Sequence, residues 1–237
     1  MIYFLLYPLV FVLLRLMMRV LGRLQSTGEG NVPATGGFLY CPNHVSDCDP
    51  PAVFVSTPRR AWFVGKSELF DLPVLGWLFA HFQGFPIKRD SADRDALRRI
   101  EALLQAGEPI VLFPEGRLSE TGALQKLQPG AALLSLRTGV PIVPVGITNT
   151  NGIVPYGKLW PRVSPRPVRV AYGPPIYPQD YAALPRREAI SAMMLALGAA
   201  LANLTHQPVP FPQPVPFPQP SDDAAANEVS PRNLAET

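Results

Sequence analysis

The stretch GFLYCPNHVSDCDPP, residues 37–51, decides the fold that we predict for this chain. It begins with a short apolar run, Phe38 to Cys41, which lies between glycines and Pro42 and predicts a buried strand. Asp49, before two prolines, predicts a helix N-cap followed by the first helical turn. His44 is therefore expected on a loop from a strand into a helix. In open α/β sheets, ligands bind beyond the carboxyl ends of such strands.

His44 and Asp49 are the two side chains of this loop suited to acid–base chemistry. Imidazole has an unperturbed pKa near neutrality, so it can take a proton from a substrate, and a carboxylate on its second nitrogen would fix the tautomer. On a continuous helix this spacing would place the two side chains on different faces, so the pairing requires the loop. The alternative is structural, with Asp49 as a helix cap and His44 as a polar loop residue.

Length, charge and cysteine content narrow the class of protein. A chain of 237 residues with 47% hydrophobic content can form one substantial core with appendages. A net charge of +3 without a dense basic patch favours an anionic membrane surface or a phosphate-bearing substrate over nucleic acid. Cys41 and Cys48 are too close for a disulfide framework and lack zinc-spaced partners. We therefore expect reduced thiols, a cytoplasmic setting and no metal.

The first residues predict contact with a membrane. Met1 to Leu14 carries no charge, and Arg15, Arg19 and Arg23 follow at helical spacing. A helix of this uncharged length reaches about 21 Å, short of the roughly 30 Å of a hydrocarbon core, so we expect a re-entrant or interfacial helix. No basic residue precedes the run, which argues against a signal peptide, and the arginines after it favour a cytoplasmic domain. The alternative is an N-terminal helix buried in the core.

Strands alternate with helices through the rest of the chain, which indicates an α/β fold with a mixed, mostly parallel sheet flanked by helices. We expect strands at 38–41, 61–65, 85–87, 109–113, 141–147 and 168–172, and helices at 52–56, 72–82, 91–106, 131–138 and 186–204. Residues 25–34 have the composition of a linker. From Gln207 the hexapeptide QPVPFP occurs twice in succession, which predicts an extended, disordered tail.

Four short blocks carry a resemblance to a known family. They are NHVSDCD at 43–49, GFPIKR at 84–89, FPEGRLS at 113–119 and VPIVPVGI at 140–147. In this order and spacing they resemble the signature blocks of the glycerolipid acyltransferase family, which includes 1-acylglycerol-3-phosphate acyltransferases. The stretch KSEL at 66–69, with Pro73 and Gly76, resembles the family sequence between the first two blocks. The likeness covers about Leu24 to Tyr172 and implies a glycerol-3-phosphate acyltransferase-like fold.

The resemblance implies an O-acyltransferase of phospholipid biosynthesis, and the arginines after the N-terminal apolar run favour the cytoplasmic face of a membrane. The fatty acyl group would pass from acyl-CoA or acyl-carrier protein, the co-substrate, to a lysophospholipid hydroxyl, with no cofactor. The leading acceptor is 1-acylglycerol-3-phosphate (lysophosphatidic acid), which would give phosphatidic acid. His44 would take the hydroxyl proton and Asp49 would orient the imidazole. Together with the composition of the two ends, this predicts a membrane-associated helix at 1–24, an acyltransferase domain at 25–206 and a disordered Pro-rich tail at 207–237.

Five further residues are implied in binding the acceptor: Lys88, Arg89, Glu115, Gly116 and Arg117. A guanidinium suits a phosphate through its planar, bidentate geometry, which makes Arg89 the first candidate, with Lys88 and Arg117 similar in kind. By likeness to the family, Glu115 and Gly116 shape the acceptor site and Glu115 bonds a glycerol hydroxyl. The fourth block would be structural or would line the acyl chain.

Two alternatives remain open. The branch of the family that forms phosphatidic acid usually has Phe-Pro-Glu-Gly-Thr-Arg-Ser in the third block, whereas here Arg117 directly follows Gly116. This variant resembles bacterial 2-acylglycerophosphoethanolamine acyltransferases, so another lysophospholipid is the second candidate acceptor. A membrane-bound esterase or thioesterase would instead use Cys48 or Ser46 as nucleophile with His44 as base, although the chain has no Gly-x-Ser-x-Gly elbow.

Overall fold

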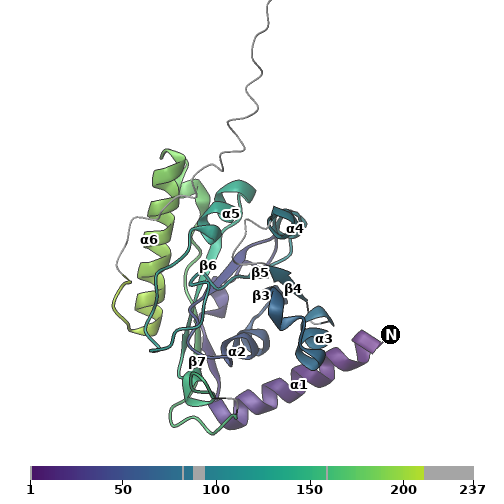
Figure 1. The fold of residues 1–237 in the computed structure, drawn as a ribbon. Helices are drawn as coiled ribbons and strands as arrows, with labels where there is room; N and C mark the ends of the chain where they lie inside the picture. The colour runs from purple at the N-terminus through teal and green to yellow at the C-terminus, as the bar shows by residue number, and fades with distance from the viewer. Residues whose placement is uncertain (1, 82, 88–93, 159, 211–237) are drawn as a thin grey trace, which may run out of the picture.

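A seven-stranded sheet forms the centre of the molecule (Figure 1). The computed structural model describes residues 2–81, 83–87, 94–158 and 160–210. The strands lie in the order β1-β7-β6-β2-β5-β3-β4, and all neighbours run parallel except β6 and β7. Their bounds are β1 Gln25–Thr27, β2 Leu39–Pro42, β3 Trp62–Lys66, β4 Gly84–Ile87, β5 Ile110–Val111, β6 Ile142–Thr148 and β7 Arg169–Tyr172. The predicted mixed, mostly parallel sheet is confirmed.

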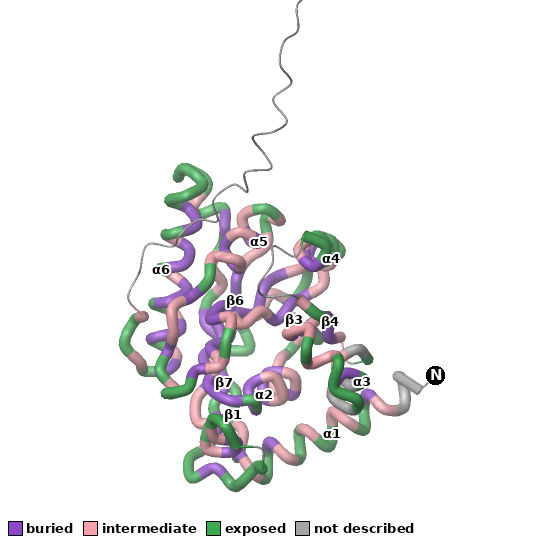
Figure 2. Tube along the Cα trace, viewed as in Figure 1, coloured by how far each residue is buried: buried purple, intermediate pink, exposed green. Residues whose placement is uncertain are grey.

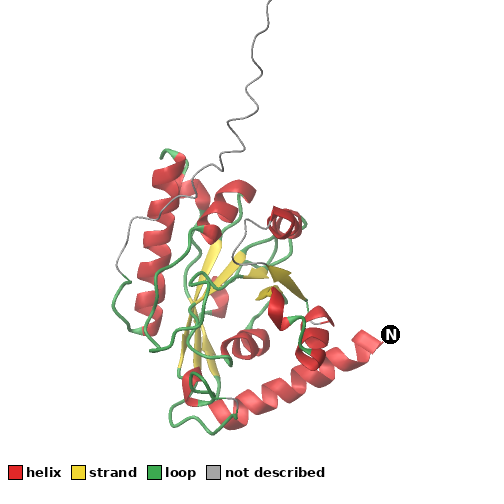
Figure 3. Cartoon of the chain, viewed as in Figure 1, coloured by secondary structure: helices red, strands yellow, loops and turns green. Residues whose placement is uncertain are grey.

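Helices cover both faces of the sheet (Figures 1 and 3). Their bounds are α1 Ile2–Gly22, α2 Asp49–Ser56, α3 Pro73–His81, α4 Arg94–Gln105, α5 Gly130–Thr138 and α6 Arg186–Thr205. One face is covered by α1 and α2, and the opposite face by α4, α5 and α6. Each expected helix is present, with bounds that differ by a few residues, and residues 82 and 91–93 of the expected ranges lie outside the described residues.

The pleat of β2 explains why both faces need a cover. Successive side chains of a strand point to opposite sides of the sheet. Tyr40 packs into the core on the α1 and α2 side, whereas Leu39 and Cys41 pack into the core on the α4, α5 and α6 side. All three are fully buried, and Figure 2 shows burial concentrated along the central strands. A strand buried on both faces appears in sequence as a continuous apolar run, which is how this one was predicted.

Helix α1 lies along the domain with one face inward and one face outward. Its inner face includes Tyr7, which is 7% exposed, and Met18, which is fully buried. Its outer face carries large apolar residues that are between 55% and 62% exposed: Leu9, Val12, Leu13, Leu16 and Val20. The predicted N-terminal helix therefore exists, and it combines a face packed on the core with an exposed apolar face. Most of the described α1 surface is drawn as exposed or intermediate in Figure 2.

A helix long and apolar enough to cross a membrane lies toward the other end of the chain. Among the described residues, α6 is the one helix that meets the length and composition for a span, and half of its apolar stretch is buried in the domain. Its buried residues, including Met193, Leu197 and Leu201, pack into the core on one face of the sheet. Burial of this kind is expected of a core helix, which is how α6 fits into the fold.

One short strand was not expected. Residues 25–34 have a linker composition, but Gln25–Thr27 form the edge strand β1, which pairs in parallel with β7. All three residues are exposed, so no apolar alternation marks the strand in the sequence. The strand depends on a partner more than 140 residues away, since Gln25 is in register with Arg169. The linker assignment at these three residues is wrong for that reason.

Candidate active site

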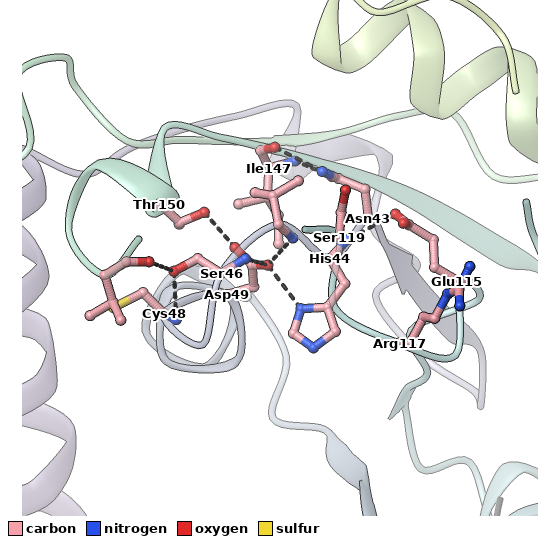
Figure 4. Close-up of polar contacts among 12 residues, drawn as sticks. Asn43, His44, Ser46, Cys48, Asp49, Glu115, Arg117, Ser119, Ile147 and Thr150 are labelled. Atoms are coloured by element: carbon pink, nitrogen blue, oxygen red, sulfur yellow. Dashed lines mark hydrogen bonds and ion pairs between the residues drawn. The ribbon is translucent and has the colours of Figure 1, made fainter. Parts of the chain in front are cut away.

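The chain leaves β2 at Pro42 and reaches α2 through a short loop that holds His44 (Figure 4). His44 Nδ1 lies 2.9 Å from Asp49 Oδ2. The imidazole is 13% exposed and the carboxylate is fully buried. Because Nδ1 faces the carboxylate, Nε2 is the nitrogen available to a substrate. The loop geometry that the pairing requires is therefore present.

Asp49 is held by a set of donors rather than by a capping bond. Its Oδ2 accepts hydrogen bonds from the backbone N–H of Val45 at 2.6 Å and of Ser46 at 2.8 Å, in addition to the contact with His44. Its Oδ1 accepts one from the Thr150 hydroxyl at 2.5 Å. A buried carboxylate needs such partners to remain charged. The expected N-cap role is wrong, since Cys48 occupies the N-cap position and Asp49 is the first helical residue.

The third block fixes the peptide of His44 from both sides. The His44 N–H donates to Glu115 Oε1 at 2.9 Å, and the His44 carbonyl accepts from the Ser119 N–H at 2.8 Å. The ring of Phe113 lies against the imidazole, with centroids 4.3 Å apart. Two parts of the chain about 70 residues apart thus hold one histidine in place. The consequence is an imidazole with little freedom to leave the carboxylate.

The fourth block holds the start of the same loop through Asn43. Asn43, fully buried, donates through Nδ2 to the Ile147 carbonyl at 3.0 Å and accepts from the Ile147 N–H at 2.7 Å. It therefore extends the pairing of β2 with β6 by one side chain. Ile142, Val143 and Val145 of the block are fully buried in the centre of the sheet. Of the two roles expected for this block, the contacts give it the structural one.

Glu115, Gly116 and Arg117 turn the chain sharply beside the histidine. Glu115 is 3% exposed, and both carboxylate oxygens accept hydrogen bonds from the protein. Burial raises the pKa of this carboxyl, while the bonds from His44 and Gln125 act in the opposite direction. Gly116 has φ +71°, a left-handed conformation that glycine adopts without strain. Arg117 is exposed, and the remaining two predicted binding residues, Lys88 and Arg89, lie outside the described residues.

A family model described as Acyltransferase matches residues 23–148, which contain His44, Asp49 and the Glu115 and Ser119 contacts to the His44 peptide. The chain belongs to this acyltransferase family. The match agrees with the resemblance drawn from the four blocks. It spans the sheet from the end of α1 to β6, so the family assignment covers the loop that carries the acid–base pair.

Relatives of this acyltransferase carry one recurring name. The chain is 33% identical to a chloroplastic 1-acyl-sn-glycerol-3-phosphate acyltransferase of Brassica napus over 134 residues, 55% of this chain and 39% of that protein. It is 25% identical to the Bacillus subtilis 1-acyl-sn-glycerol-3-phosphate acyltransferase over 82% of this chain and 94% of that protein. The chain thus spans about two fifths of the length of the plant relative.

A solved structure has the same fold. The crystal structure of the 1-acyl-sn-glycerophosphate acyltransferase PlsC from Thermotoga maritima matches with a TM-score of 0.60 and 24% identity, over 78% of each chain. At this identity the match shows the fold, which agrees with the mixed sheet described above.

The nucleophiles required by the hydrolase alternative are poorly placed. The Ser46 hydroxyl is buried and donates to the Val154 carbonyl at 2.8 Å. Cys48 is 5% exposed, and burial raises the pKa of its thiol to about 11. Figure 4 shows Cys48 on the far side of Asp49 from the imidazole. In the described part of the chain, no group of three or more His, Cys, Asp or Glu side chains could hold a metal ion.

Sequence reasoning missed several residues that support the site: Asn43, Phe113, Ser119, Gln125 and Thr150. Most act through contacts between distant segments, which no local pattern reveals. Asn43, Phe113 and Ser119 did lie inside the quoted blocks, so the block resemblance was the signal that could have found them.

Proposed function

We propose that this protein transfers a fatty acyl group from an acyl thioester to the hydroxyl of a lysophospholipid, with 1-acylglycerol-3-phosphate as the leading acceptor and phosphatidic acid as the product. The observation that carries the proposal is the 2.9 Å contact between His44 Nδ1 and the buried Asp49 carboxylate. Membership of the acyltransferase family supports the reaction class. The names of the relatives support the acceptor.

The chemistry needs a base because an alcohol is a poor nucleophile at neutral pH. In the proposed step, His44 Nε2 takes the proton of the acceptor hydroxyl while the oxygen attacks the thioester carbonyl carbon. Asp49 stabilises the imidazolium that forms. The tetrahedral intermediate then breaks its C–S bond, and His44 returns the proton to the departing thiolate of acyl-CoA or acyl-carrier protein. The thioester is activated enough that no acyl-enzyme is required.

The phosphate of the acceptor needs a cation near this base. Among the residues that the structure describes, Arg117 is the candidate for binding this phosphate. It is exposed and lies two residues from Glu115, which contacts the His44 peptide. Its terminal guanidinium nitrogens suit two phosphate oxygens. Lys88 and Arg89 remain candidates from the sequence. Because Arg117 directly follows Gly116, 2-acylglycerophosphoethanolamine is the second candidate acceptor.

The outer face of α1 supports a location at the membrane surface. Its row of exposed apolar residues, Leu9, Val12, Leu13, Leu16 and Val20, would be covered by lipid. Arg15 and Arg19 are exposed on the same helix, so they would lie near lipid headgroups. We propose an interfacial helix that holds the catalytic domain against the cytoplasmic leaflet, where the lipid acceptor resides.

The test is acyl transfer by purified, detergent-solubilised protein from radiolabelled acyl-CoA, and separately from acyl-carrier protein, to a panel of lysophospholipids. We expect labelled phosphatidic acid from lysophosphatidic acid, and its loss in His44→Ala. Transfer to lysophosphatidylethanolamine alone would move the proposal to the second acceptor. Release of free fatty acid without transfer to any lysophospholipid would overturn it in favour of a hydrolase.

A further inference from the structure

Gln125 is the residue of the site that neither the four blocks nor the acid–base pair explains. It lies in the loop between β5 and α5, eight residues after Arg117 and ten after Glu115. Its backbone N–H donates to Glu115 Oε2 at 3.2 Å. Its side-chain amide donates to the same oxygen at 3.0 Å and to the Arg117 carbonyl at 3.3 Å. Its Oε1 accepts from Arg117 Nε at 3.0 Å.

Two of these hydrogen bonds place the neutral side-chain amide between the Glu115 carboxylate and the Arg117 guanidinium. An amide has a donor end and an acceptor end, so it can bond an anion on one side and a cation on the other. The network also fixes the orientation of the amide, because the opposite orientation would aim NH₂ at the Arg117 N–H. Within the described residues, Arg117 has no ion pair with a carboxylate. Its positive charge is therefore not neutralised by Glu115.

From this geometry we infer that Gln125 is a positioning residue, which holds Arg117 by Nε and leaves both terminal nitrogens to bind the acceptor phosphate. The inference rests on the proposed function, in which Arg117 contacts that phosphate. It also gives Glu115 a role through the protein, since that carboxylate bonds the His44 N–H on one side and Gln125 on the other. Hydrogen bonds therefore run from the His44 peptide through Glu115 and Gln125 to Arg117.

The backbone of the loop is held on both sides of Gln125. On the following side, the Gln128 N–H donates to the Pro114 carbonyl at 2.7 Å. Ser119 Oγ donates to the Ala123 carbonyl at 2.7 Å, and the Leu124 N–H donates to Gln207 Oε1 at 2.6 Å. Leu124 is 9% exposed and packs in the core beside α5 and α6. Substitution of the Gln125 side chain should therefore leave the backbone of the loop in place.

The first test is Gln125→Leu, which keeps the size of the side chain and removes its amide. We expect the KM for lysophosphatidic acid to rise about tenfold, with kcat and the KM for acyl-CoA changed less than twofold, because hydrogen bonds to charged groups are among the stronger ones. Gln179→Leu is the matched control, since Gln179 is exposed and makes its side-chain bond to the Gly139 carbonyl. An unchanged acceptor KM, or an equal rise for both substrates, would overturn the inference.

The second test is Gln125→Glu, which keeps an acceptor for Arg117 Nε but places a second carboxylate beside Glu115. Two adjacent carboxylates bind a shared proton as the pH falls, and the shared proton replaces the lost donor. We expect the ratio of variant to wild-type kcat/KM to rise as the pH is lowered from 8 to 5.5. The ratio is the quantity to follow because any pH dependence that the two proteins share cancels in it. A flat ratio would overturn the inference even if Gln125→Leu failed to fold. Absence of transfer by the wild-type protein would instead refute the proposed function.

Discussion

At the His44 loop the polar groups are buried and paired inside the protein, whereas along the outer face of α1 large apolar groups are exposed. Asp49 is fully buried and accepts four hydrogen bonds or contacts from its neighbours. By contrast, Leu13 of α1 is 62% exposed and Leu9 is 61% exposed. Each region reverses the usual rule for its residue type, since carboxylates normally face water and leucines normally avoid it.

The two reversals have different physical consequences. A buried carboxylate that is fully bonded fixes one geometry, so changes there should alter the rate of the chemical step. An exposed apolar row is unfavourable in water and favourable in lipid, so changes there should alter where the protein resides. If this separation is correct, variants of the loop lose activity on every form of substrate, and variants of α1 lose activity only on membrane-presented substrate.

The largest effect is expected for His44→Ala. Loss of the general base should lower kcat about a thousandfold without changing vesicle binding. His81→Ala is the matched control, because His81 is exposed on α3 and bonds the Trp77 carbonyl of its own helix. The measurement is transfer from acyl-CoA to lysophosphatidic acid in detergent, with vesicle flotation in parallel. Retained transfer in His44→Ala would remove the acid–base assignment altogether.

A smaller loss, about a hundredfold in kcat, is expected for Asp49→Asn. A neutral amide cannot stabilise the imidazolium as a carboxylate does. In the orientation that puts the amide NH₂ in the place of Oδ2, the NH₂ would also face the N–H groups of Val45 and Ser46. The thermal unfolding temperature should fall as well. Asp47→Asn supplies the control, since Asp47 is exposed in the same loop. Equal losses in the two variants would mean that general charge, not the pairing with His44, explains the effect.

Whether a feature could be predicted from the sequence depends on how far apart in the chain its interacting residues lie. The strand, loop and helix around His44 were predictable because apolar runs, prolines and the four blocks are local signals. The Thr150 hydroxyl on Asp49, about 100 residues away, and strand β1 on β7 were not, since each depends on a distant partner. The N-cap prediction for Asp49 erred because its oxygens bond backward to Val45 and Ser46.

For α1 the sequence predicted the helix, but only the fold shows which side is outward. An uncharged run does not show which face of the helix is buried, because nearly every position is apolar. Packing against α2 selects Tyr7, Phe11 and Met18 as the inner side, with the Tyr7 and Phe54 rings 5.6 Å apart. The residues left outside then define the surface available to lipid.

That surface can be tested with the double variant Leu13→Gln and Leu16→Gln. Burial of a leucine side chain in an apolar medium is worth roughly 1.5–3 kcal/mol, so partial immersion of two should lower vesicle partitioning about tenfold or more. Activity on detergent-dispersed substrate should stay within twofold of the wild type. Leu195→Gln is the control, because Leu195 is 48% exposed on α6. An equal loss of vesicle partitioning in the α1 double variant and in Leu195→Gln would show that α1 has no special role at the membrane.

The smallest effect is expected at Cys48, which lies in the catalytic loop but faces away from its chemistry. Burial raises the pKa of this thiol to about 11, so at pH 8 only about one molecule in a thousand carries the reactive thiolate. Alkylation by iodoacetamide should therefore be slow and should rise about tenfold per pH unit toward pH 11, the direction set by a raised pKa. Cys48→Ala should keep transfer within twofold of the wild type. Near loss of transfer in Cys48→Ala would instead indicate that Cys48 is a nucleophile. The loop would then act through a covalent step, and the contrast with α1 would have to be redrawn.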